Sequence, residues 1–94
     1  MEKKITITVE PVAGSFNLFV IILNGKAVKI TEGSKAEYAG DLPEGDITIR
    51  TRASGMGQAK YKVTIDLPGE DRDVTANHKL DRGYDEQEFK IKNS

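Results

Sequence analysis

Apolar and polar residues alternate with a period of two along most of the chain. Ile5, Ile7 and Val9 alternate with Thr6 and Thr8. Residues 59–67 repeat the pattern, with Ala, Tyr, Val, Ile and Leu on one parity and Lys, Lys, Thr and Asp on the other. This is the pattern of a half-buried β-strand, and the 3.6-residue helical period is nearly absent. The sequence therefore predicts an all-β protein.

Turn-forming residues divide the alternating segments into about eight short strands. The turn signals are Asn24-Gly25 and four longer connections at 41–45, 54–58, 68–71 and 81–84. The predicted strands are Lys3–Glu10, Phe16–Leu23, Lys26–Thr31, Lys35–Ala39, Asp46–Ala53, Ala59–Leu67, Arg72–Leu80 and Glu86–Lys92. Such spacing favours a single antiparallel two-sheet β-sandwich over residues 1–94, with a small β-barrel as the alternative. We expect the first strand to stop at Pro11.

The segment Phe16–Leu23 is apolar on both of its faces. A two-residue turn at Asn24-Gly25 would place Phe19 opposite Ile30 on the core face. The opposite face then predicts a partner interface made of Phe16, Leu18, Val20, Ile22 and Lys29. Burying one of the four apolar side chains in this set against a partner would contribute roughly 1.5 to 3 kcal/mol of favourable free energy. Two alternatives stay open: a loop covers the stripe, or a β-bulge changes the parity within the strand.

A second surface feature follows if the predicted strands 46–53 and 59–67 form a hairpin with residues 54–58 as its loop. Four cations would then share one outward face: Arg50, Arg52, Lys60 and Lys62. Like charges opposite each other destabilise a sheet, so a compensating group is expected. Glu86 and Glu88, or Glu37, could supply acids from a neighbouring strand. The alternative is an anionic ligand such as an acidic glycan or a phosphate-bearing surface.

Composition excludes several classes of function. Fourteen Lys and Arg against fifteen Asp and Glu give a net charge of −1, which argues against a nucleic-acid-binding protein. There is no Cys, and His78 is the one His, so a catalytic triad or a transition-metal site is not expected. His78 shares its parity with Val74, Ala76 and Leu80, which predicts a packed or edge histidine without a reactive role. We therefore expect a protein that is not an enzyme.

Calcium is the one cofactor that the sequence brings into consideration. Carboxylates crowd one connection, at Asp66, Glu70, Asp71 and Asp73. Oxygen ligands on a loop can converge on Ca²⁺, although the spacing is not that of the helix-loop-helix motif. Solvated acidic turns are the alternative, and no other cofactor is expected. Sugar stacking would depend on Tyr84, because Trp is absent and Tyr61 has core parity.

The stretch NGKAVKITEGSKAEYAGDLPEGDITIRTR, residues 24–52, resembles carboxypeptidase-regulatory-like and related Ig-like accessory modules of bacterial proteins. The matching positions are Gly25, Val28, Thr31, Gly33, Leu42, Pro43, Gly45 and Ile49, with Ile47 where the family usually has Tyr. The resemblance implies a non-catalytic β-sandwich used for adhesion, spacing or docking. It transfers no binding residue to this chain.

The chain begins without a signal-peptide pattern, and its longest apolar run, residues 18–23, is too short for a membrane span. This does not distinguish a cytoplasmic protein from a secreted one whose signal has been removed. The sequence favours an interaction module that forms a homo-oligomer or binds a protein partner through its apolar strand face. Alternatives are a lectin-like module for an anionic or calcium-bridged carbohydrate, and a structural spacer or engineered protein without a natural ligand.

Overall fold

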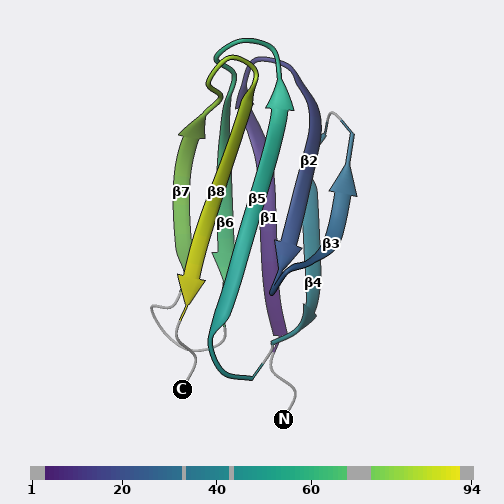
Figure 1. Ribbon diagram of the computed structural model, residues 1–94, viewed down its shortest axis with the longest axis vertical. Coiled ribbons are helices and arrows are strands. Elements are labelled where there is room, and N and C mark those ends of the chain that lie inside the picture. The colour runs from purple at the N-terminus through teal and green to yellow at the C-terminus, as the bar shows by residue number, and fades with distance from the viewer. Residues whose placement is uncertain (1–3, 33, 43, 68–72, 92–94) are drawn as a thin grey trace.

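The computed structural model describes residues 4–32, 34–42, 44–67 and 73–91 and contains two antiparallel four-stranded sheets packed face to face (Figure 1). One sheet, which we call sheet A, has the order β4-β1-β6-β7, and the other, sheet B, has the order β3-β2-β5-β8. The predicted β-sandwich is confirmed. Its strands are β1 Lys4–Ala13, β2 Phe16–Leu23, β3 Lys26–Thr31, β4 Ala36–Asp41, β5 Ile47–Gly55, β6 Lys60–Asp66, β7 Val74–Lys79 and β8 Tyr84–Ile91.

The strand ends follow the turn residues of the sequence. At the β2–β3 turn Asn24 and Gly25 have φ values of 49° and 84°, which suits a two-residue hairpin turn of the primed type. The expected stop at Pro11 is wrong, because β1 continues to Ala13. Pro11 is tolerated there because the ladder is already interrupted by a β-bulge next to it.

The predicted β5–β6 hairpin is wrong. β5 pairs with β2 and β8 in sheet B, whereas β6 pairs with β1 and β7 in sheet A. The connection between them crosses from one sheet to the other. Arg50 and Arg52 therefore lie on sheet B and Lys60 and Lys62 on sheet A, so the four cations do not share a face.

The core lies between the two sheets and is built from the alternating apolar residues. Ile5, Ile7 and Val9 of β1 are fully buried, as are Tyr61, Val63 and Ile65 of β6, at no more than 1% exposure. Phe16 and Phe19 of β2 pack against Tyr61, with ring centroids 6.0 and 6.1 Å from the Tyr61 ring. The predicted core parity of β1 and β6 is confirmed.

In the strands that the structure describes, three β-bulges change the parity of neighbouring residues. In the β2–β5 pair Asn17 is the extra residue, since Phe16 lies opposite Gly55 and Leu18 opposite Ser54. The bulge turns Phe16 into the core, where it is 7% exposed, so its assignment to the outward interface is wrong.

A second bulge, at Val28 of β3, shifts the β2–β3 register by one residue. Val20 then lies opposite Ile30, and Phe19 opposite Thr31, so the predicted Phe19–Ile30 pair is wrong. Lys29 lies opposite the core-facing Ile21, which takes it off the outward face on which we expected it. The third bulge is at Val12 of β1.

Three loops meet at one end of the sandwich, at the top of Figure 1. Backbone hydrogen bonds join them: Gly55 donates to Gly83 O at 2.9 Å, Gly83 donates to Gly57 O at 2.9 Å, and Met56 donates to Ser15 O at 3.0 Å. A Cβ at Gly55 would collide with the Ser15 carbonyl, so this close approach requires glycine. The loop junction ties the two sheets together at that end.

Candidate functional site

The outward face of sheet B carries a row of aliphatic side chains, which we call the apolar stripe. Three of them, Leu18, Val20 and Ile22, project from the central strand β2 and are half-buried. The fourth, Ile30, lies opposite Val20 on the edge strand β3 and is 62% exposed. The structure therefore places three of the five predicted interface residues on this face and adds Ile30, which the sequence had assigned to the core.

Arginine side chains border the apolar stripe along β5. Arg52 lies opposite Val20 and Arg50 opposite Ile22. Arg52 also lines a pocket of about 250 Å³ together with Leu18, Val20, Ser54 and Tyr84. Long aliphatic stems of this kind cover apolar surface while their charged ends stay in water, which accounts for the half-buried state of Leu18, Val20 and Ile22.

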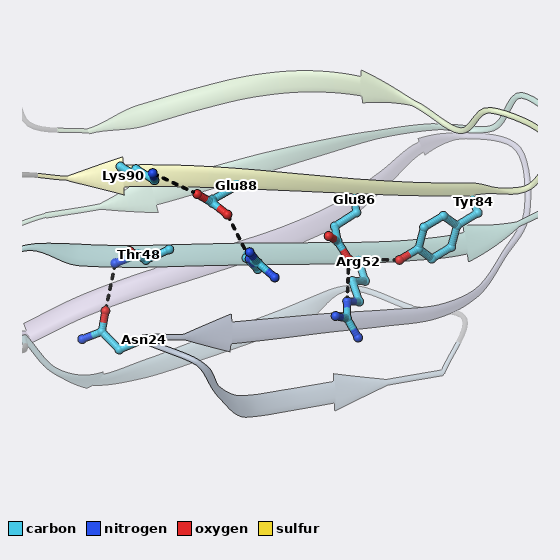
Figure 2. A network of polar contacts seen from close by, with 8 residues as sticks. Asn24, Thr48, Arg52, Tyr84, Glu86, Glu88 and Lys90 are labelled. Atoms are coloured by element: carbon cyan, nitrogen blue, oxygen red, sulfur yellow. Dashed lines mark hydrogen bonds and ion pairs between the residues drawn. The ribbon is translucent and has the colours of Figure 1, made fainter.

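Each of these two arginines is paired with a glutamate of β8, and Figure 2 shows the Arg52–Glu86 pair. Arg50 Nε lies 3.0 Å from Glu88 Oε2, and Arg52 Nε lies 2.7 Å from Glu86 Oε2. Lys90 extends the row, with Nζ 3.5 Å from Glu88 Oε1. The expectation that β8 supplies the compensating acids is confirmed for Glu86 and Glu88. Glu37 lies on β4 in sheet A and does not take part.

The two pairs Arg50–Glu88 and Arg52–Glu86, which we call the Arg–Glu ladder, influence the pKa values of the groups beside them. The hydrogen bond from Arg52 holds the pKa of Glu86 below its ordinary value, and a second hydrogen bond from the Tyr84 hydroxyl, at 3.1 Å, acts in the same direction. The partial desolvation of Tyr84 and its bond to Glu86 raise the pKa of its phenol. Tyr84 is 48% exposed at the end of the stripe. The face therefore combines aliphatic groups with arginines and one tyrosine, and arginine and tyrosine are among the residue types that contribute most at protein interfaces.

The outward face of sheet A is different in character. The outward positions of its central strands β1 and β6 carry Thr6, Thr8, Glu10, Lys62 and Thr64. Lys60 follows Lys62 at the next outward position of β6 and lies opposite Lys79 of β7. Lys60 and Lys62, predicted to join two arginines, are thus part of a separate basic surface.

A polar cluster fills the space between the sheets near the edge strands β7 and β8. The Tyr61 hydroxyl donates to Asp85 Oδ2 at 2.6 Å, and Gln87 Nε2 donates to the same oxygen at 2.9 Å. Burial, together with the bond to Asp85, strongly raises the pKa of Tyr61. The His78 ring packs between Tyr61 and Phe89, with centroid distances of 5.4 and 6.0 Å. The predicted packing of His78 is confirmed.

The predicted calcium ligands are only partly within the described residues. Glu70 and Asp71 lie outside them. The neighbouring Asp73 carboxylate raises the pKa of Asp66, first by accepting a hydrogen bond from the protonated form of Asp66 and then by charge repulsion. Within the part of the chain that the structure describes, no three His, Asp or Glu side chains come close enough together to hold a metal ion. Calcium binding at this connection stays a prediction.

Sequence reasoning missed Ile30, and it assigned Tyr84 to a turn rather than to the start of β8. The bulge that exposes Ile30 leaves no mark on the local alternation, so no signal in the sequence could have found it. Over the described residues there is no helix long and apolar enough to cross a membrane. Neither a protein-family model, a curated protein nor a solved structure matches the chain.

Proposed function

We propose that this chain is a non-catalytic association module that dimerises through the outward face of sheet B. The observation that carries the proposal is the contrast between the two outward faces. The central strand of sheet B presents Leu18, Val20 and Ile22, whereas the equivalent positions of sheet A present threonines and charged residues. Water contact with an apolar row costs free energy that a partner surface would remove.

A second copy of the chain is the occupant that the charges favour. The face carries both signs, in the Arg50–Glu88 and Arg52–Glu86 pairs, and is close to neutral. Two copies meeting face to face therefore experience little net repulsion, and each supplies acids and bases to the other. A strongly acidic or strongly basic partner would gain less from such a surface.

The size of the face is also sufficient. The sandwich extends 42 × 24 Å across its broad face. A stable interface removes roughly 800 Å² from each partner, which this area can provide. The apolar stripe would form its centre, and the Arg–Glu ladder with Tyr84 one side of its rim.

The test is the molar mass of the protein across a concentration series, measured by light scattering after size exclusion. We expect the mass to rise from one to two chains. Val20→Lys should raise the dimer dissociation constant at least about 100-fold, because an unpaired ammonium would be buried at the centre. Thr8→Lys is the matched control, since Thr8 has the equivalent outward position on the central strand of sheet A.

Two results would overturn the proposal. One is a wild-type protein that stays monomeric up to millimolar concentration. The other is Val20→Lys with an unchanged dissociation constant and a native far-UV spectrum. Should Val20→Lys fail to fold, Ile30→Lys decides, because a side chain that is 62% exposed on an edge strand tolerates lysine in the monomer.

A further inference from the structure

A pocket of about 330 Å³ opens on the outward side of sheet A, near the loop junction. Its lining residues are Val12, Lys60, Tyr61, Asn77, His78 and Lys79. The side chains of Tyr61 and His78 point into the core, so these two residues close the pocket from below. We call this hollow the lysine pocket.

The β1 bulge explains why the pocket is open. Pro11 lies opposite Tyr61 and Ala13 opposite Lys60, so Val12 is the extra residue and leaves the ladder. Val12 is 57% exposed and forms an apolar wall. Bulges often redirect side chains beside functional sites, and here the bulge places the Val12 side chain beside the side chains of Lys60 and Lys79.

The two lysines of the pocket have no acidic partner among the residues that the structure describes. Lys60 and Lys79 lie directly opposite each other in the β6–β7 pair, which brings two ammonium groups onto neighbouring positions of one face. Among the described residues, no carboxylate lies within ion-pair distance of either lysine. Glu10 of β1 lies opposite Lys62 in the ladder, and not opposite Lys60.

From this geometry we propose that the lysine pocket binds a phosphate monoester. A phosphate monoester carries between one and two negative charges at neutral pH, which matches two ammonium groups. The volume is at the lower end of small-molecule sites and exceeds that of the phosphoryl group, so it leaves room for an organic substituent against Val12. Asn77, whose amide is exposed beside Lys79, adds a neutral hydrogen-bond donor.

The experiment is an amide chemical-shift titration of the full chain with phenyl phosphate, with inorganic phosphate as a second arm, both at fixed ionic strength. We expect saturable shifts at Tyr61, Asn77 and His78, and binding of phenyl phosphate several-fold tighter than that of inorganic phosphate. Equal affinity for both would show that no organic group is recognised and would overturn the monoester assignment.

Variants test the lysines themselves. Lys79→Gln should weaken phenyl phosphate binding at least about five-fold, and the double variant Lys60→Gln/Lys79→Gln should abolish saturation. Lys26→Gln removes the same charge from an exposed position on β3 of the other sheet and should bind like the wild type. Equal weakening by Lys26→Gln, or unchanged binding by the double variant, would refute the site. All the substituted side chains are exposed, so the variants should fold, and the wild-type melting temperature should rise with ligand while that of the double variant stays constant.

The lysine pocket lies on the face opposite the proposed dimer interface. Phenyl phosphate should therefore leave the dimer dissociation constant unchanged, and Val20→Lys should bind the ligand like the wild type. The two proposals succeed or fail separately.

Discussion

Replacing Tyr61 by Phe tests the polar cluster inside the sandwich. The Tyr61 side chain is 0% exposed, and its hydroxyl makes a 2.6 Å hydrogen bond to Asp85 Oδ2. A hydrogen bond to a charged group contributes about 1.5 to 3 kcal/mol, so Tyr61→Phe should lower the free energy of unfolding by about 2 kcal/mol at pH 7. For a domain of this length, that corresponds to a fall in melting temperature of roughly 8 to 16 °C.

The stability difference between Tyr61→Phe and the wild type should shrink at high pH. Because burial and Asp85 raise the pKa of the folded Tyr61 phenol, the unfolded chain loses this proton first, at a pKa of about 10. The stabilisation that comes from the raised Tyr61 pKa is fully present only below the pKa of the unfolded chain. Above that pH the free energy of unfolding of the wild type falls by up to about 1.4 kcal/mol per pH unit. Tyr61→Phe lacks this loss, so the deficit of about 2 kcal/mol should close within roughly 1.5 pH units.

The assay is urea unfolding of wild type and variant at pH values from 7 to 11.5, followed by far-UV circular dichroism. Tyr38→Phe is the control, since Tyr38 is half-buried and the structure gives its hydroxyl no hydrogen bond within the described residues. It should change stability by less than about 0.5 kcal/mol. A Tyr61→Phe deficit no larger than that of the control, or one that does not shrink above pH 10, would show that the Tyr61–Asp85 bond does not form in solution.

Three further outcomes follow from the fold and the ladder. Phe16→Ala should destabilise the protein by about 3 to 5 kcal/mol in urea unfolding, and Leu18→Ala by about 1 kcal/mol, because one side chain is in the core and the other is half-exposed; similar losses would contradict the parity change in β2. The carboxyl pKa of Glu86, followed by NMR titration, should lie below its ordinary value in the wild type and rise in Arg52→Gln. The stabilisation from this pair is present above the ordinary Glu pKa and is lost as the pH falls through the lowered one. An unchanged Glu86 pKa in Arg52→Gln would mean that the pair is not formed in solution. Gly55→Ala should lower the free energy of unfolding by at least about 2 kcal/mol, because its Cβ meets a backbone carbonyl of the neighbouring loop; a smaller change would show that the loop junction can open.

Local patterns predicted the strands well because the side-chain period and the turn residues act over a few positions. The bounds of β2 and β3 are as predicted, and the Asn24-Gly25 turn is confirmed. Strand pairing is a different kind of information, since it depends on which distant segments share a sheet. The short Gly-rich connection after β5 is typical of a hairpin, yet it crosses between sheets, and no local feature distinguishes the two outcomes.

The candidate surface was found in part for the same reason. Leu18, Val20 and Ile22 were identified correctly because no extra residue of β2 lies between them and the Asn24-Gly25 turn, so their alternation counted from the turn holds. Phe16 and Ile30 were misplaced because each lies beyond a bulge, and one extra residue inverts every face assignment that follows it. A bulge is defined by how a strand pairs with its neighbour, so the alternation of residues within one strand does not reveal it.

The bulge at Asn17 means that the number of residues in β2 decides which face of sheet B each side chain occupies. It lets a single strand supply an aromatic ring to the interior at one end and aliphatic groups to the exterior along the rest. Deleting Asn17 would remove the extra residue and leave a regular strand in which Phe16 still faces inward and Leu18 outward. Deleting a residue between Leu18 and Leu23 would instead turn Leu18 inward and Phe19 outward, a larger change than any substitution there could cause. Insertions and deletions in that part of β2 should therefore be tolerated far less than point changes.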